Sequence, residues 1–231
     1  MRRQRWDSPS SGTETGPLSE AQVEGLAKSP RGSRQRGKRR AVVDAATRMF
    51  LRHGYAGASM DAIAREAGVC KQTIYNHYAN KEALFGAIVL ERSERLLSSL
   101  RIDAVRSPDV ETVLSSFARR YLELMLDPSS LALYRLLMAE VGRLPELGEA
   151  TYRLGPETAE SALTRYLEEQ CRLGTLSIGQ PRMAAGQLFG LLKGNLQIRA
   201  LLDTNLSVPE ARREEIAAGA VRVFLAAYSA S

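Results

Sequence analysis

The chain has 231 residues, of which 44% are hydrophobic and 25% are charged, so it can bury a core and falls in the globular class. The net charge of +6 comes from residues 1–40, which hold 10 Lys and Arg against 4 Asp and Glu, whereas residues 41–231 hold 22 of each. This asymmetry favours a polyanionic partner such as nucleic acid, although basic tails also occur as solvated linkers.

Several classes of protein are excluded by what the chain lacks. Its two cysteines, Cys70 and Cys171, are far apart, and its two histidines are His53 and His77, so we expect no disulfide framework, no metal site and no cofactor. No apolar run approaches the roughly 18 residues that span a membrane. The basic N-terminus lacks the apolar segment of a secretory signal, which predicts a cytoplasmic protein without membrane association.

The first segment, residues 1–36, is rich in Ser, Gly, Pro, Arg and Glu and has no apolar periodicity. It is predicted to be a disordered basic arm. The arm leads into "RGSRQRGKRR", which places six basic residues and no acid between Arg31 and Arg40. We expect this basic run, including Arg39 and Arg40, to contact phosphates or a minor groove if the partner is DNA.

The rest of the chain is predicted to be all-α. From Ala41 the apolar residues repeat with helical spacing until Gly54, which suits the residue after a helix end. No long β-branched alternation occurs. Six prolines divide the remainder into helical segments, each expected at the first turn of a helix: Pro108, Pro128, Pro145, Pro156, Pro181 and Pro209. The segment "LALYRLLMAEV" is apolar almost all round, which predicts a central helix.

The stretch "EAGVCKQTIYNHYANKEALF" predicts two short helices joined by a glycine turn. Ser59 is suited to cap a helix over residues 60–67, in which Asp61 can pair with Arg65. Gly68 supplies the turn to a second helix over residues 71–78, and Asn80 can cap the long helix that follows. This arrangement is typical of a helix-turn-helix.

The second of these helices has one clear inward anchor, Ile74. Its other side chains form hydrogen bonds, as major-groove recognition of DNA requires. A solvated helix with tyrosines in the core is the alternative, and we expect at least one of Tyr75 and Tyr78 to pack inward. His77 has no acid three or four residues away, so catalysis is not expected and the protein is predicted not to be an enzyme.

The segment from Arg39 to Val89 resembles the DNA-binding domain of TetR-family transcriptional regulators, through the joint spacing of its phenylalanine, glycine, tyrosine and "AGV" positions. The stretch "LYRLLMAEVGRLPELGEATYRLGP" resembles the AcrR/AefR-like C-terminal domain. The resemblance implies an all-helical homodimer with a DNA-binding domain over residues 37–97, containing three helices and the helix-turn-helix. A C-terminal helical bundle over residues 98–231 would dimerise and bind a ligand.

Residues that usually face DNA in this family are carried over position by position. Cys70 stands where serine commonly caps the recognition helix, and Gln72 where glycine or proline is frequent, so the operator sequence cannot be transferred. Cys70 is either a tolerated small residue or, beside Lys71, a redox switch. The carried-over positions are Ser59, Met60, Lys71, Gln72, Thr73, Tyr75, Asn76, His77, Tyr78 and Lys81.

Two surfaces of the C-terminal domain are predicted from residue type. Small residues on one face of "PRMAAGQLFGLLKGNLQIRALL" and of the last helix suggest a four-helix dimer interface, or else close packing within the chain; they are Gly186, Gly190, Gly194, Ala217, Ala220 and Val223. An effector pocket for an apolar or amphipathic organic molecule, or ordinary core, is predicted around Phe117, Tyr121, Met125, Tyr134, Leu137, Met138, Leu163, Tyr166, Phe189 and Leu192.

The sequence therefore favours a dimeric repressor that binds a palindromic operator in double-stranded DNA and is released by a small organic effector. A transcriptional activator of the same architecture remains an alternative. So does a helical protein that binds a ligand or a partner without binding DNA, although the polar and basic side chains of residues 71–77 argue against it.

Overall fold

The computed structural model describes residues 30–106 and 109–230. The chain divides into two units, Met1–Arg39 and Arg40–Ser231. In the first unit the described backbone, residues 30–39, is helical, so helix formation begins before the predicted end of the arm at residue 36. The rest of the predicted arm, residues 1–29, lies outside the described residues. Apart from Arg39, the residues of every site considered below belong to the second unit.

The described residues form helices joined by loops, and they hold no strand beyond an isolated β-bridge between Leu176 and Ser229. The predicted all-α fold class is therefore confirmed. The helices are α2 (Pro30–Gly57), α3 (Met60–Glu66), α4 (Lys71–His77), α5 (Lys81–Arg106), α6 (Val110–Leu126), α7 (Pro128–Glu140), α8 (Pro145–Tyr152), the π-helix η1 (Arg153–Glu157), α9 (Thr158–Arg172), α10 (Pro181–Lys193), α11 (Leu196–Leu202) and α12 (Glu210–Tyr228).

One hydrophobic core lies among α2, α3, α4 and the first half of α5. Phe50, Tyr55 and Phe85 form its centre, with ring centroids 5.4 to 5.8 Å apart in stacked and edge-to-face arrangements. Leu133, Leu137 and Leu147 extend this core into α7 and α8. The recognition-type helix α4 thus rests on a core that also reaches the C-terminal bundle.

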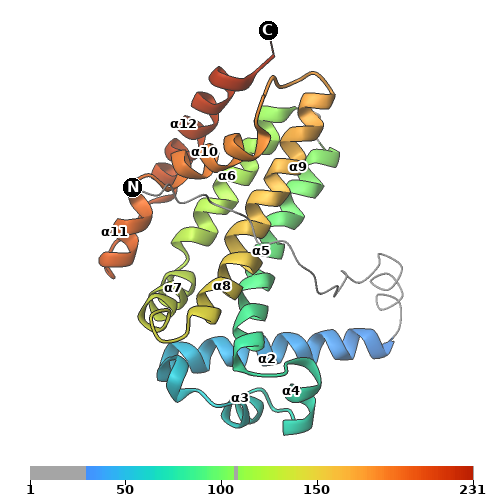
Figure 1. Cartoon of the computed structure of the whole chain (residues 1–231), viewed down its shortest axis with the longest axis vertical. Helices are drawn as coiled ribbons and strands as arrows, with labels where there is room; N and C mark the ends of the chain where they lie inside the picture. The colour runs from blue at the N-terminus through green and yellow to red at the C-terminus, as the bar shows by residue number, and fades with distance from the viewer. Residues whose placement is uncertain (1–29, 107–108, 231) are drawn as a thin grey trace, which may run out of the picture. The chain divides into compact units, whose positions relative to one another are not determined.

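The second core fills the bundle of α6, α9, α10 and α12 and the second half of α5 (Figure 1). Its largest fully buried rings are those of Phe117 and Phe224. Helix α5 is continuous, and it contributes Phe85 to the first core and Leu96 to the second. The helix-turn-helix region and the bundle therefore share a single rigid element.

Three of the predicted helix positions are wrong. Pro156 lies inside η1 instead of beginning a helix. Gly194 ends α10 with φ 41°, so the predicted helix through residues 181–202 is two helices. The segment expected to be central lies in α7, which buries Leu133 and Leu137 but leaves Tyr134 39% and Met138 57% exposed.

None of the helices in the described ranges combines the length and apolar character needed to cross a lipid bilayer.

Candidate functional site

The α3–α4 unit has the caps and the turn that the sequence predicts. Ser59 caps α3 by accepting a hydrogen bond from the Ala62 amide at 3.2 Å. Gly68, at φ 66°, turns the chain toward α4. Ile74 is fully buried and anchors α4 on the first core. A helix of seven residues is not stable alone, so α4 depends on this anchor.

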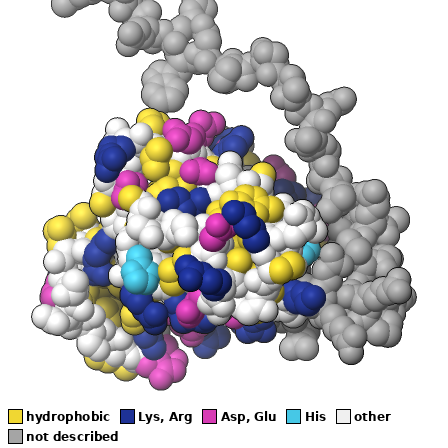
Figure 2. Space-filling view, turned by 90° about the horizontal axis from the view of Figure 1, so that it is seen from below, with side chains coloured by type: hydrophobic (Ala, Val, Ile, Leu, Met, Phe, Trp, Pro, Cys, Tyr) yellow, Lys and Arg dark blue, Asp and Glu magenta, His cyan; other side chains and the backbone are white. Residues whose placement is uncertain are grey.

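The outward side of α4 consists of hydrogen-bonding groups. Lys71, Gln72, Tyr75 and Asn76 are exposed, and the Gln72 amide donates to the Asn76 side-chain oxygen at 2.8 Å. Thr73 and His77 are half-buried beside them. Figure 2 shows the molecule from below, where basic side chains are spread among acidic, hydrophobic and other groups. Amides, a lysine and a threonine are groups that recognise base edges in the major groove.

An ion pair joins α3 to α4. Lys71 Nζ donates to Asp61 Oδ2 at 2.9 Å, and this hydrogen bond raises the pKa of Lys71. The sequence predicted Arg65 as the partner of Asp61. The approach of α4 to the first turn of α3 makes Lys71 the partner instead, and Lys71 also lies over the Tyr75 ring at 5.8 Å.

At three further positions carried over from the family, the side chain is buried or half-buried. Met60 and Tyr78 are 7% and 5% exposed and belong to the first core, so their side chains are not available to a partner in this conformation. Lys81 is half-buried and donates to the backbone carbonyls of Tyr55 at 2.6 Å and Ala58 at 3.2 Å. Arg39 and Arg40 are exposed, each within its own unit of the chain.

Cys70 occupies the N-cap of α4 without capping it through its side chain. Its thiol is exposed, and its Sγ lies 3.0 Å from Thr73 Oγ1. The hydrogen bond with Thr73 is the main cause that lowers the pKa of the Cys70 thiol. The sequence alone predicts that Cys70 lies at the start of this helix, but it does not predict the contact between Cys70 and Thr73.

A cavity of about 370 Å³ opens within the C-terminal bundle, between α5, α6, α7, η1 and α10. Its size lies in the range of small-molecule sites. Tyr121 stacks beside Phe117 and meets Phe189 edge-to-face at 4.9 Å, and burial raises the pKa of Tyr121, so its hydroxyl stays protonated. Five of the predicted pocket residues line this cavity: Tyr121, Met125, Tyr134, Leu137 and Phe189.

The other five predicted pocket residues lie elsewhere. Phe117, Leu163 and Leu192 are buried in the second core, Tyr166 packs against it, and Met138 is 57% exposed on α7. Burial raises the pKa of Tyr166 to about 12. These residues have the same apolar spacing as the lining residues, so the pattern does not separate core from cavity.

The polar lining of the cavity was not predicted. Arg92, Ser93, Tyr152, Glu160, Lys193 and Gln197 all line it. Lys193 Nζ lies 5.8 Å from the centroid of the Phe189 ring, next to the aromatic cluster. Each is a polar residue in an amphipathic helix, which is typical of a solvated face, so the sequence held no signal that these side chains converge.

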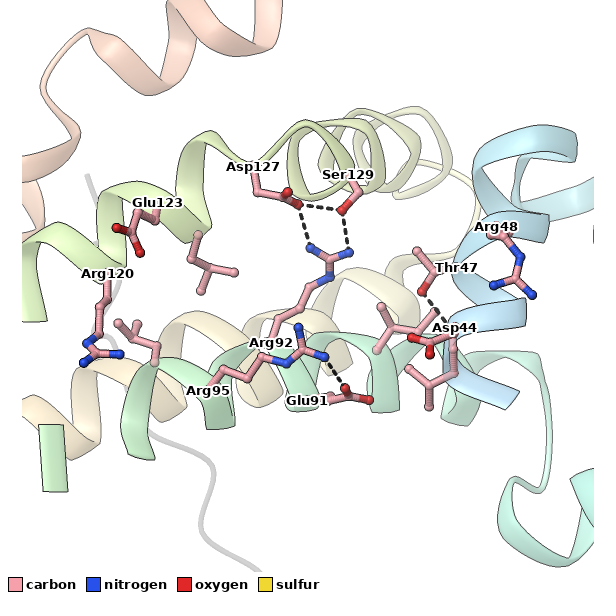
Figure 3. A pocket seen from close by; sticks show the side chains of 14 residues that line it. Asp44, Thr47, Arg48, Glu91, Arg92, Arg95, Arg120, Glu123, Asp127 and Ser129 are labelled. Atoms are coloured by element: carbon pink, nitrogen blue, oxygen red, sulfur yellow. Dashed lines mark hydrogen bonds and ion pairs between the residues drawn. The ribbon is translucent and has the colours of Figure 1, made fainter. Parts of the chain in front are cut away.

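A second cavity, of about 580 Å³, lies on another side of α5 against α2 and the α6–α7 junction (Figure 3). Two of its arginines pair with carboxylates: Arg92 pairs with Asp127 at 3.0 Å, and Arg95 pairs with Glu91 at 2.6 Å. Arg92 also donates to Ser129 and Ser130, and it lines both cavities. This side chain therefore ties α5 to the start of α7 at the wall between the two cavities.

The predicted dimer residues are divided between surface and core. Ala217 and Ala220 are 1% and 6% exposed because α12 packs on α6 and α10 within the chain, so their side chains cannot form an interface. Gly186, Gly190 and Val223 are exposed, whereas Gly194 lies at the end of α10. On α10 the exposed side also carries Met183 and Leu191, at 52% and 41% exposure, which the sequence analysis missed.

Comparison with known proteins places this geometry in a family. Residues 42–88 match the model of bacterial regulatory proteins of the tetR family, and residues 112–230 match the AefR-like transcriptional repressor C-terminal domain. A TetR-family regulator of known structure from Mesorhizobium loti MAFF303099 is 33% identical, with a TM-score of 0.73 over 85% of this chain and 98% of that one.

Two further relatives are informative. The structure of the flavonoid-responsive regulator FrrA is 32% identical, with a TM-score of 0.67 over 83% of this chain and 97% of that one. The regulator UidR of Escherichia coli K12 is 36% identical over 78 residues, which is 32% of this chain and 40% of UidR. The chain thus spans less than half of that relative. The proteins of this family are DNA-binding regulators that dimerise, and they are not enzymes. The chain belongs to the TetR family of transcriptional regulators.

Proposed function

We propose that this protein is a dimeric repressor whose two α4 helices enter successive major grooves of a palindromic operator. The exposed, hydrogen-bonding side of α4 carries this proposal, because Lys71, Gln72 and Asn76 can reach base edges while Tyr75 and His77 reach phosphates. The match of the C-terminal half to a repressor domain supports repression over activation. The proposed DNA-contacting set is Arg39, Arg40, Ser59, Lys71, Gln72, Thr73, Tyr75, Asn76, His77 and Lys81.

Helices α10 and α12 pack against each other within the chain. Dimerisation is proposed through the sides of these two helices that face solvent. Met183, Gly190 and Leu191 on α10 and Gly219 and Val223 on α12 give these sides a small and apolar character. Replacing Leu191 by Glu should increase the fraction of monomer in sedimentation. The matched control is Leu51→Glu on α2, which removes a similarly exposed leucine, at 39% exposure, and adds the same charge outside α10 and α12. An unchanged dimer in Leu191→Glu would remove this side of α10 from the interface.

The effector is proposed to be a planar aromatic molecule with hydrogen-bonding substituents, of the flavonoid class. The similarity to FrrA suggests this class, and three features of the cavity support it. The Tyr121–Phe189 ring pair offers an aromatic wall, the Tyr121 hydroxyl can donate, and Lys193 can pair with a phenolate or carbonyl oxygen beside that wall.

The experiment starts from purified protein bound to DNA from upstream of its own gene. This complex is titrated with a set of flavonoids and, as the non-aromatic comparison, with a long-chain fatty acid. Release by a flavonoid but not by the fatty acid supports the proposed class. Lys193→Met should weaken that response, while Arg165→Met on the exposed side of α9, which does not line the cavity, should not. Release by the fatty acid alone would reject a flavonoid effector and leave DNA binding as proposed.

A further inference from the structure

Two amide side chains lie next to each other on the outward side of α4. Gln72 and Asn76 are the second and sixth residues of this helix, both are exposed, and Gln72 Nε2 donates to Asn76 Oδ1 at 2.8 Å. Residues four apart on a helix are neighbours on its surface, and such polar pairs stabilise each other. Because the hydrogen bond holds both side chains in one arrangement, they lose less conformational freedom when they bind a partner.

The bond leaves a fixed pattern of hydrogen-bonding groups for that partner. The atoms outside the bond are Gln72 Oε1, which accepts, and Asn76 Nδ2, which donates. A half-turn of both amides reverses the bond, and the pair then presents a donor from Gln72 and an acceptor from Asn76. In either arrangement the pair offers one acceptor and one donor side by side.

Neighbouring polar groups of α4 are engaged in other contacts. Lys71 Nζ donates to Asp61 of α3 at 2.9 Å, and Thr73 Oγ1 lies 3.0 Å from Cys70 Sγ. A lysine favours guanine, whose major-groove edge has two acceptors, but the ion pair with Asp61 holds Lys71 against α3. Ile74 is fully buried in the first core. The amide pair is therefore the part of α4 best placed to select a base.

Adenine is the base whose major-groove edge complements this pattern. Its N6 amino group donates and its N7 accepts, so Gln72 Oε1 and Asn76 Nδ2 can bind both groups at once. Guanine presents two acceptors, O6 and N7, and would place one of them against the Gln72 oxygen. Cytosine presents an amino donor alone and thymine an acceptor beside its methyl group, so each of these bases leaves one amide without a partner.

We propose that the Gln72–Asn76 pair reads one adenine in each half-site of the operator, with both amides on the same base. This inference rests on the proposed DNA-binding function and adds to it the identity of one base pair. Gln72 departs from the glycine or proline that is frequent at this position of the family, so this reading is a property of this chain. Gln72 and Asn76 act here as specificity-determining residues.

The test begins with wild-type protein and a library of double-stranded DNA randomised over about three helical turns. We expect the selected sequences to share a palindromic motif with an adenine at a fixed position of each half-site. In the double variant Gln72→Ala with Asn76→Ala, the preference for that adenine should disappear while the rest of the motif remains. Exchanging this A·T pair for G·C should weaken wild-type binding by about 5- to 150-fold and hardly change binding by the double variant.

A modified base tests the same contact with the wild-type protein alone. 7-Deazaadenine still pairs with thymine but lacks the N7 acceptor. Placed at the selected adenine, it should weaken binding by about 2- to 10-fold for each hydrogen bond that is lost. The double variant should bind the modified and the unmodified site equally. Fluorescence anisotropy with labelled DNA measures these affinities, and circular dichroism confirms that the variant is folded.

Changing one amide should change the preferred base. In Gln72→Lys the new ammonium can donate to Asn76 Oδ1, and the pair then presents donors alone, which fit the two acceptors of guanine. We therefore expect the preference to change from adenine to guanine. The matched control is Tyr75→Phe, which removes an exposed hydrogen-bonding group of α4 that we assign to phosphates. This variant should bind all sequences more weakly and keep the preference for adenine.

The outcomes separate the base assignment from the proposed function. A specific motif with the same base preferences in wild type and double variant overturns the reading of adenine and leaves DNA binding intact. Loss of preference at a base other than adenine, or full wild-type affinity for the 7-deazaadenine site, also overturns it. So does an unchanged preference for adenine in Gln72→Lys, or its loss in Tyr75→Phe. Selection of no motif by the wild-type protein overturns both proposals.

Discussion

Lys71, the first residue of α4, donates a hydrogen bond to the carboxylate of Asp61 in the first turn of α3, with 2.9 Å between Nζ and Oδ2. Both side chains are more than half exposed, at 65% and 55%. The proposed DNA-reading helix therefore holds its basic side chain beside an acid when no DNA is bound.

The variant Asp61→Asn should bind DNA more tightly, because it releases Lys71 and removes a negative charge close to the phosphates. Exposed ion pairs contribute little, so we expect a gain of about two- to fivefold. Anisotropy titrations at several salt concentrations measure it, with Glu94→Gln on α5 as a charge-matched control far along the chain from α4. Weaker binding by Asp61→Asn would show that the pair is needed to position α4.

Ile74 should be essential for the stability of the α3–α4 unit, because it is the buried anchor of a seven-residue helix. Replacing it by Ala should lower the free energy of unfolding by about 2–5 kcal/mol. The neighbouring change Gln72→Ala affects an exposed side chain and should leave stability almost unchanged while weakening DNA binding. Chemical denaturation together with DNA titration separates the two roles, and equal losses of stability in both variants would contradict them.

The thiol of Cys70 should react faster than an ordinary cysteine at neutral pH, because the hydrogen bond with Thr73 lowers its pKa and favours the thiolate. In a Cys171→Ser background, iodoacetamide alkylation followed against pH reports on this single thiol. The variant Thr73→Val keeps the shape of the side chain and removes the hydrogen bond, so the midpoint of the profile should move to higher pH. Identical midpoints would remove Thr73 as the cause.

Acid should weaken the Arg92–Asp127 attachment in a defined window. Because the folded-state pKa of Asp127 lies below its ordinary value of 3.8, its charged form stabilises the fold above that value. The stability advantage of the wild type over Asp127→Asn should be complete at neutral pH and decline as the pH falls below 3.8 through the folded-state pKa. Urea denaturation at several pH values measures it, and a pH-independent difference would mean that Asp127 acts only through its shape.

Much of the helix-turn-helix could be predicted because local rules determine it. Ser59 and Asn80 cap helices, Gly68 takes a positive φ, and Ile74 is the one apolar residue that α4 can bury. These features depend on residues within one turn of each other. The proposed boundary at residues 97 and 98 stays a prediction, because α5 runs through it without a break.

The effector cavity was harder to predict because it depends on how distant helices meet. Tyr166 and Tyr134 are both tyrosines in helical segments, but Tyr166 packs against the second core and Tyr134 lines the cavity. Pro156 was predicted to begin a helix, but it lies inside the π-helix η1, whose Gly155 packs closely on Val89 of α5. Arg92 is one of several arginines in α5, and only the approach of Asp127 gives it a structural role.

The most direct test of the central claim is a binding titration of the purified full-length protein with DNA from upstream of its own gene, in excess unrelated competitor DNA. We expect saturable, sequence-specific binding in which two protomers occupy one palindromic site, and at least tenfold weaker binding by the double variant Gln72→Ala with Asn76→Ala. Equal affinity for the upstream fragment and for the competitor, unchanged in the double variant, would contradict the assignment of α4 as the DNA-reading helix.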